Sequence, residues 1–226
     1  MNNDIKVVHF YHSGVMVETK KSQIYFDVIS NQKTFVDASK NQYYFVSHAH
    51  NDHYDPKVFH VSSHNTKLIF SDDIEDQPEG HAVTRVEPNK IYEIDNMTIK
   101  TFDSTDSGVA FLVAVDELII FHSGDLNWWH WENRPVQEQK IEEVAYKAIV
   151  SNLEGEKIDI AFVPVDPRLK SAASFAVCHF IEKIVVKTIF PIHFGESFEL
   201  LGEILEKEIK DERVKLVTKR NESFLI

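Results

Sequence analysis

Three histidines and one aspartate lie within six residues of one another and are the side chains with the most evident chemistry. They are His48, His50, Asp52 and His53. The apolar run Tyr43–Val46 just before them is typical of a buried β-strand, so the cluster is expected where a strand ends and a loop begins. Side chains alternate along an extended chain, so three of the four can point the same way, and the fourth can join them after a turn. Imidazole and carboxylate are ligands of zinc, iron and manganese, so the cluster predicts a metal site rather than a polar loop with surface histidines.

Further ligand-type side chains follow three later apolar runs. The run Leu118–Phe121 leads through His122-Ser123-Gly124 into Asp125, Ile160–Val165 leads into Asp166, and Thr188–Ile192 leads into His193. A site made from the ends of strands in one sheet would collect these side chains together with the first cluster.

The composition is that of one folded domain spanning residues 1–226. The chain has 226 residues, of which 43% are apolar, and this is enough for a large buried core. Its formal net charge of −12 opposes binding to a nucleic-acid backbone, which depends on clusters of lysine and arginine. We therefore expect no nucleic-acid partner.

The sequence also bears on the compartment in which the protein is found. Cys178 is the only cysteine, so no intramolecular disulfide can form and nothing indicates an oxidising environment. The first residues, Met1–Asp4, do not begin a signal peptide, and no apolar run approaches the ~20 residues that span a membrane. A cytoplasmic protein with no membrane partner is expected. The oligomeric state is left open, an oligomer included.

The order of the expected elements indicates two sheets with helices outside them. The first half consists of short strand-like runs, which begin with an antiparallel meander over Ile5–Asp27. The second half alternates strands with helices. Helices are predicted over Pro135–Asn152, from Ser171 to Ile184 and from Phe198 to Ile209, and closing strands over Val214–Thr218 and Ser223–Ile226. The fold class that follows is α/β (α+β), in one domain.

The pattern of motifs resembles the metallo-β-lactamase superfamily of hydrolases. It consists of H-x-H-x-D-H after a strand, then a strand that ends in Gly-Asp, then a strand that ends in His, and it extends from about residue 8 to 195. The stretches Tyr11–Gly14 and Pro191–Phe194 are similar to the branch related to the ascorbate-phosphate lactonases. The resemblance implies a four-layer αββα sandwich of two mixed β-sheets flanked by helices.

The resemblance also implies a ligand set for two divalent ions per chain. His48 and His50 would bind at a first metal position, and Asp52, His53 and His193 at a second, with Asp125 bridging the two. Zinc is the expected metal, with manganese or iron as alternatives.

The chain departs from the family at the first metal position. A third histidine should lie in the loop before Val109, but that loop, residues 102–108, contains none. Asp106 is the most economical substitute, and the alternatives are Asp103, Ser104, His12 and His130. An aspartate would make the position richer in oxygen and would favour manganese or iron. If Asp106 only organises a turn, the first position binds weakly and the protein works with one ion.

Residues after Asp125 are expected to form the substrate pocket. All three tryptophans fall in the segment Trp128-Trp129-His130-Trp131, and at least one is expected to line the pocket, with Trp128 and His130 as the candidate contacts. Arg168 is a candidate for holding an anionic substrate group, unless it pairs with Asp166. His12 is the remaining candidate for substrate binding.

The chemistry of this set is hydrolysis of a small molecule. A pair of divalent ions can activate water for attack on a carbonyl or phosphoryl centre. Asp52 and Asp125 would be the catalytic carboxylates, with Asp52 orienting the nucleophile and protonating the leaving group. An ester or lactone is favoured over a phosphoester. The alternatives are a phosphodiesterase or nuclease, which would need a basic groove, and a non-catalytic metal-binding protein in which the altered loop has disabled the first position.

Overall fold

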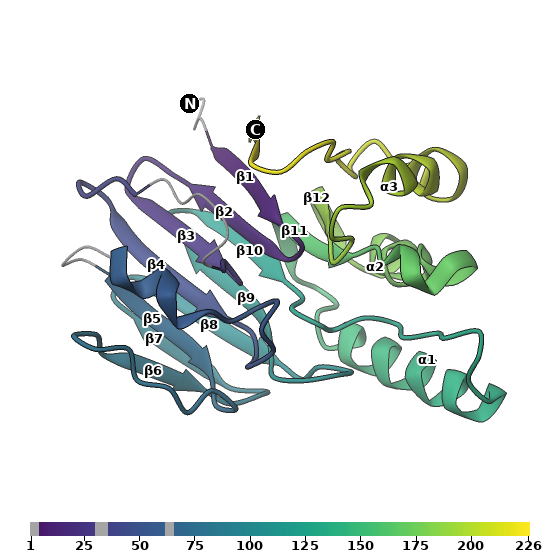
Figure 1. The fold of residues 1–226 in the computed structure, drawn as a ribbon, viewed down its shortest axis with the longest axis horizontal. Helices are drawn as coiled ribbons and strands as arrows, with labels where there is room; N and C mark the ends of the chain where they lie inside the picture. The colour runs from purple at the N-terminus through teal and green to yellow at the C-terminus, as the bar shows by residue number, and fades with distance from the viewer. Residues whose placement is uncertain (1–4, 30–35, 62–65) are drawn as a thin grey trace.

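Two β-sheets packed face to face form the centre of the molecule (Figure 1). The computed structural model describes residues 5–29, 36–61 and 66–226. The first sheet has the strand order β13-β1-β2-β3-β4-β5-β6. Its strands are β1 (Lys6–Tyr11), β2 (Gly14–Glu18), β3 (Ser22–Phe26), β4 (Asn41–Val46), β5 (Thr66–Ser71), β6 (Val83–Val86) and β13 (Glu222–Leu225). The pairs among β1, β2 and β3 are antiparallel, which confirms the meander, and the pairs from β3 to β6 are parallel.

The second sheet is also mixed and has the order β12-β11-β10-β9-β8-β7. Its strands are β7 (Ile91–Ile94), β8 (Met97–Phe102), β9 (Ala110–Val115), β10 (Leu118–His122), β11 (Lys157–Pro164) and β12 (Val185–Ile192). The pairs from β7 to β10 are antiparallel, whereas β10, β11 and β12 are parallel. The parallel strands β4, β10, β11 and β12 therefore all deliver a carboxyl end from which a loop can carry functional side chains.

Strand β4 shows how the two-residue period of a strand builds the core. Tyr43 and Phe45 belong to the large apolar cluster between the sheets, where the Phe45 ring meets Phe111 of β9 at a centroid distance of 5.1 Å. Tyr44 and Val46 point the other way, into a second cluster on the outer face of the first sheet. Both faces of β4 are thus buried, which explains why its sequence is a continuous apolar run.

Among the described residues, three α-helices cover the second sheet, and a single short helix covers the first (Figure 1). They are α1 (Val136–Ser151), α2 (Phe175–Lys183), α3 (Phe198–Ile204), and the 3₁₀ helix η1 (Pro56–Val61), with two further short helical turns, η2 (Pro167–Ala172) and η3 (Leu205–Ile209). The Phe180 ring of α2 stacks on Phe121 of β10 at 5.2 Å, and Phe59 of η1 packs in the outer cluster of the first sheet. The predicted sandwich of two mixed sheets between helices is confirmed, although its fourth layer is only this 3₁₀ helix.

Some elements differ from the sequence-based expectation. The segment Val214–Thr218 is not a strand, because it pairs with β12 only through a bridge between Ile189 and Val214. Strand β7 was not expected, since it lies at a sheet edge and its burial alternates between exposed and half-buried positions. Ser171 does not cap α2. It lies in η2 and donates to Glu132, whereas the helix begins after Ser174.

Within the described residues, none of the helices combines the length and the apolar character that crossing a bilayer requires.

Candidate metal centre

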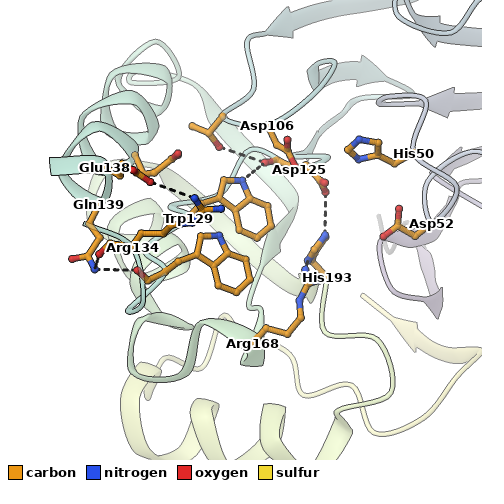
Figure 2. Close-up of a pocket in the computed structure, with 13 residues that line it drawn as sticks. His50, Asp52, Asp106, Asp125, Trp129, Arg134, Glu138, Gln139, Arg168 and His193 are labelled. Carbon is orange, nitrogen blue, oxygen red and sulfur yellow. Dashed lines mark hydrogen bonds and ion pairs between the residues drawn. The ribbon is translucent and has the colours of Figure 1, made fainter. Parts of the chain in front are cut away.

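The candidate ligands meet where the carboxyl ends of strands from both sheets lie side by side. His48, His50, Asp52 and His53 follow β4 of the first sheet, whereas Asp125 and His193 follow β10 and β12 of the second. The expectation that one sheet supplies the site is therefore wrong, because the two sheets pack face to face and share this edge. Figure 2 shows Asp125 between Asp106 and His193, with His50 and Asp52 facing them across the pocket.

Asp125 is the centre of the cluster. Its Oδ1 lies 3.0 Å from His53 Nε2 and 3.3 Å from His193 Nε2, and its Oδ2 lies 3.4 Å from His48 Nε2. Although they are buried, Oδ1 of Asp125 and Nε2 of His48 and His53 make no hydrogen bond. Ligand atoms bound at ~2.0–2.1 Å to one tetrahedral zinc lie ~3.3–3.4 Å apart, so these separations are those of atoms arranged around shared ions. The residues present therefore fit a metal centre.

The far side of two of these imidazoles is held by Asp27, a residue that follows β3. Its Oδ2 accepts from Nδ1 of His53 at 2.8 Å and from the Ser47 hydroxyl at 2.7 Å. Because Ser47 gives its proton to Asp27, its Oγ must accept from Nδ1 of His48, which lies 2.9 Å away. In both histidines Nδ1 is thus the donor on the far side, which leaves Nε2 as the nitrogen that can bind a metal, as in metal-binding imidazoles.

Sequence reasoning missed Asp27, although a signal was present. It is a charged residue directly after the buried strand β3, and it has the same relation to its strand as the candidate ligands have to theirs. Its role depends on the contact between the ends of β3 and β4, which are parallel neighbours. The sequence of a single segment does not indicate which strands will be neighbours in the sheet.

The charged groups of the cluster shift one another's pKa values. Burial raises the pKa of Asp125, but the close contacts and positive charge of His193 and His53 outweigh burial and hold the pKa well below its usual range. Burial lowers the pKa of His53, but Asp27 and Asp125 outweigh burial and raise it to about 10. A metal ion must therefore displace a proton from His53, so metal binding releases protons and strengthens as pH rises.

His193 is oriented by Asp166, which follows β11. Oδ2 of Asp166 lies 3.1 Å from Nδ1 of His193, which leaves Nε2 of the imidazole to face Asp125. Arg168 binds the same carboxylate through two nitrogens, with Nε 3.0 Å from Oδ1 and Nη2 2.6 Å from Oδ2. The guanidinium also lines the pocket. Arg168 therefore pairs with Asp166 and also lies where contact with an anionic substrate group was expected.

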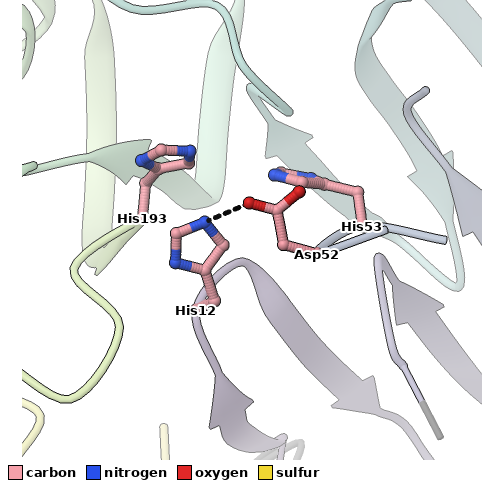
Figure 3. Close-up of side chains that lie close together, drawn as sticks. All are labelled: His12, Asp52, His53 and His193. Carbon is pink, nitrogen blue, oxygen red and sulfur yellow. Dashed lines mark ion pairs between the residues drawn. The ribbon is translucent and has the colours of Figure 1, made fainter. Parts of the chain in front are cut away.

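Asp106 lies where a substitute for the missing third histidine is needed. One carboxylate oxygen of Asp106, one ring nitrogen of His50 and one carboxylate oxygen of Asp125 all lie within 4.8 Å of one another. Among the groups of this kind formed by the described residues, none contains Asp103 or His130. His12 lies in a separate group with Asp52, His53 and His193, at the second metal position (Figure 3). The geometry thus favours Asp106 over Asp103, His12 and His130 at the first position, and Ser104 stays an alternative.

Replacing Asp106 tests this assignment against a neighbour of the same type. We expect Asp106→Ala to weaken the more weakly held ion by ~10-fold or more, because the first position loses one of its oxygen ligands. Asp103→Ala removes an exposed carboxylate of the same loop and should leave metal content unchanged. Metal per chain by mass spectrometry, after dialysis at graded free zinc, measures both. Equal metal content in the two variants would show that Asp106 only organises the turn.

Two glycines let the loops approach closely enough to form the centre. Gly108 has φ +65°, and a Cβ there would lie 1.9 Å from the carbonyl oxygen of Ser47. Gly124 has φ +52°, and its Cβ would lie 2.7 Å from the Cβ of Ser47. Ser47, which links Asp27 to His48 by hydrogen bonds, is therefore in close contact with two positions that only glycine fits. This is the structural reason for the glycine of the Gly-Asp motif.

The cluster opens into a pocket of about 470 Å³. Trp129 and Trp131 line it with parallel rings, 6.0 Å apart between centroids, and Nε1 of Trp129 donates to the carbonyl of Asp125. Trp128 and His130 do not line it. Both side chains pack on Phe175 instead, because the hydrogen bond from Trp129 turns the alternate residues of this segment toward α2. The tryptophans that line the pocket are therefore Trp129 and Trp131 rather than Trp128.

Comparisons with known proteins bear on the fold. The sequence matches no protein-family model and no curated protein. Igni18, described as a novel metallo hydrolase from the archaeon Ignicoccus hospitalis, superposes with a TM-score of 0.65 at 14% identity, over 98% of this chain and 98% of that one. The metallo-β-lactamase fold protein YhfI from Bacillus subtilis gives a TM-score of 0.61 at 12% identity, over 98% and 99%. CmlA, a diiron β-hydroxylase from Streptomyces venezuelae, gives 0.59 at 9% identity, over 100% of this chain and 55% of that one.

Similarity at such low identity speaks to architecture and not to reaction, since a metallo hydrolase and a diiron hydroxylase both superpose on this chain. The superpositions extend over nearly all of it. The chain therefore has the metallo-β-lactamase fold. This follows from two mixed sheets packed face to face, from ligand-type side chains at their shared edge, and from these superpositions.

Proposed function

We propose that the protein is a metal-dependent hydrolase of a small-molecule ester, lactone or phosphoester. One observation supports this most directly: buried ligand atoms with no hydrogen-bond partner, on His48, His53 and Asp125, come together at Asp125, which lines an open pocket. Such atoms are costly to bury unless something binds them. A divalent ion bound there would lower the pKa of water to about 7 and polarise a carbonyl or phosphoryl oxygen.

The pocket favours a small substrate over a polymer. Its volume of about 470 Å³ lies in the range of sites for small ligands. Seven charged side chains line it, five carboxylates and two guanidinium groups: Asp52, Asp106, Asp125, Glu138, Glu142, Arg134 and Arg168. A phosphodiesterase acting on nucleic acid would need the opposite balance. The flat faces of Trp129 and Trp131 supply apolar contact for the body of the substrate.

Two side chains have positions suited to the reaction itself. Asp52 is half exposed and lines the pocket beside the cluster, so it can orient an attacking water and later pass its proton to the leaving group. Arg168 is fixed by Asp166 through Nε and Nη2, which leaves Nη1 for an anionic group of the substrate. Asp52 would thus carry the proton, and Arg168 would position the substrate.

The test is turnover of model substrates by protein loaded with zinc or with manganese. We expect hydrolysis of 4-nitrophenyl acetate or γ-butyrolactone to exceed that of bis(4-nitrophenyl) phosphate, to stop with a chelator and to return with metal. Asp52→Asn should lower turnover by ~100-fold or more, because asparagine cannot carry the proton. If the loaded protein binds metal but hydrolyses none of the three, it is a non-catalytic metal-binding protein and the proposal is wrong.

A further inference from the structure

His12 occupies a backbone position that does not suit histidine. It is the first residue of the two-residue turn between β1 and β2, where Tyr11 pairs with Gly14, and its φ is +54°. Left-handed backbone is unfavourable for a residue with a Cβ, and glycine or asparagine is the usual choice in such a turn. A strained residue that persists at a site indicates that its side chain is needed there.

The side chain of His12 is buried, and its Nε2 makes no hydrogen bond. That nitrogen lies 3.4 Å from Oδ2 of Asp52, which is the separation found between Asp125 and His48. It belongs to a group in which one ligand atom from each of His12, Asp52, His53 and His193 lies within 4.8 Å of the others. Figure 3 shows the three imidazoles around the Asp52 carboxylate.

The turn that carries His12 is fixed to the rest of the site at two points. The backbone N–H of His193 donates to the carbonyl of His12 at 3.1 Å, and the two imidazole rings lie 4.1 Å apart. Nε2 of His122 lies 3.0 Å from the carbonyl of Ser13 and must donate to it, because Nδ1 of His122 accepts from Gly124. His122 is thus a satisfied core histidine, and it holds the turn against the loop that bears Asp125.

We propose that His12 is a ligand of the second metal position. This inference rests on the proposal that the cluster binds metal. The second position would then take three imidazoles, from His12, His53 and His193, with the carboxylates of Asp52 and Asp125. The first would take His48, His50, Asp106 and Asp125. The two positions therefore differ in chemistry, because one is rich in nitrogen and the other has equal numbers of imidazoles and carboxylates.

This difference implies a division of roles between the two ions. Five protein ligands leave little room for exchange at the second position, and imidazoles favour zinc there. The first position is built partly from the exposed residues His50 and Asp106, so its ion faces the pocket and exchanges more easily. The protein is then expected to keep one zinc firmly and to accept zinc, manganese or iron at the other position.

The substitution His12→Gly separates metal binding from folding. Glycine suits a left-handed turn, so the metal-free variant should melt at or above the temperature of the metal-free wild type. Zinc titration against a chromogenic chelator should show the tighter of two sites weakened by ~10-fold or more in His12→Gly. His179→Ala, which removes an imidazole of α2 that belongs to none of the three ligand groups, serves as the control and should bind zinc as the wild type does.

Each outcome decides a different point. Wild-type zinc affinity in His12→Gly would show that His12 is not a ligand, even if the protein is a metal-dependent hydrolase. Loss of the tighter site in His12→Gly but not in His179→Ala supports the assignment. A wild-type chain that binds no zinc, manganese or iron would overturn both this inference and the proposed function.

Discussion

Asp125→Ala is expected to empty both metal positions and to lower hydrolytic turnover by ~100-fold or more. The carboxylate of Asp125 lies within 3.4 Å of Nε2 of three separate imidazoles, His48, His53 and His193. Without it, these buried nitrogens would have to hold two cations with no shared negative charge between them. Metal content per chain and kcat/KM for the best model ester, measured on the same preparation, test the expectation.

Two further variants sharpen this prediction. Asp125→Asn keeps the shape of the side chain but replaces one oxygen by an amide that points protons toward ring nitrogens, so it should lose metal as the alanine variant does. Asp211→Ala removes a surface carboxylate paired with Arg213 and should change neither property. If Asp125→Asn retained two ions and full turnover, Asp125 would not bridge them.

The ligands that could be predicted from sequence are those whose geometry is local. His48, His50, Asp52 and His53 lie in one short segment after a strand, and a tight turn in which the N–H of His53 donates to the carbonyl of His50 is enough to bring them together. Asp125 and His193 were predicted because each follows an apolar run that had to be a buried strand, and β10 and β12 confirm it. The α+β sandwich followed for the same reason, since runs of strands and then alternating strands and helices have few ways to pack.

The features that could not be predicted depend on contacts between distant segments. Asp27 acts through Ser47, and His12 meets Asp52 across two loops, at sequence separations that no local pattern encodes. The tryptophan segment, Trp128–Trp131, shows that prediction from sequence has the same limit even within four residues. Its composition predicted an aromatic wall, but the hydrogen bond from Trp129 to the carbonyl of Asp125, formed only in the folded chain, decides which rings face the pocket.

Gly108→Ala is expected to destabilise the fold by ~2–5 kcal/mol, although it adds a single methyl group and removes no predicted ligand. A Cβ at Gly108 would lie 1.9 Å from the carbonyl oxygen of Ser47 and 2.6 Å from the Cβ of His48. Relieving that clash costs about 1–3 kcal/mol, and alanine at φ +65° adds ~1–2 kcal/mol. For a chain of this size the melting temperature should fall by about 10 °C, and metal content should fall with it because Ser47 and His48 must move.

Gly155→Ala provides the matched control, since Gly155 also has a positive φ, +95°, but a Cβ there would meet nothing within 4 Å. This variant carries backbone strain without the clash, so the difference in melting temperature between the two variants measures the clash with Ser47 and His48. Thermal unfolding of the metal-free and zinc-loaded forms gives both numbers. Equal losses in the two variants would mean that the loop of Gly108 can retreat from Ser47 without cost, and that the close approach of these loops does not hold His48 in place.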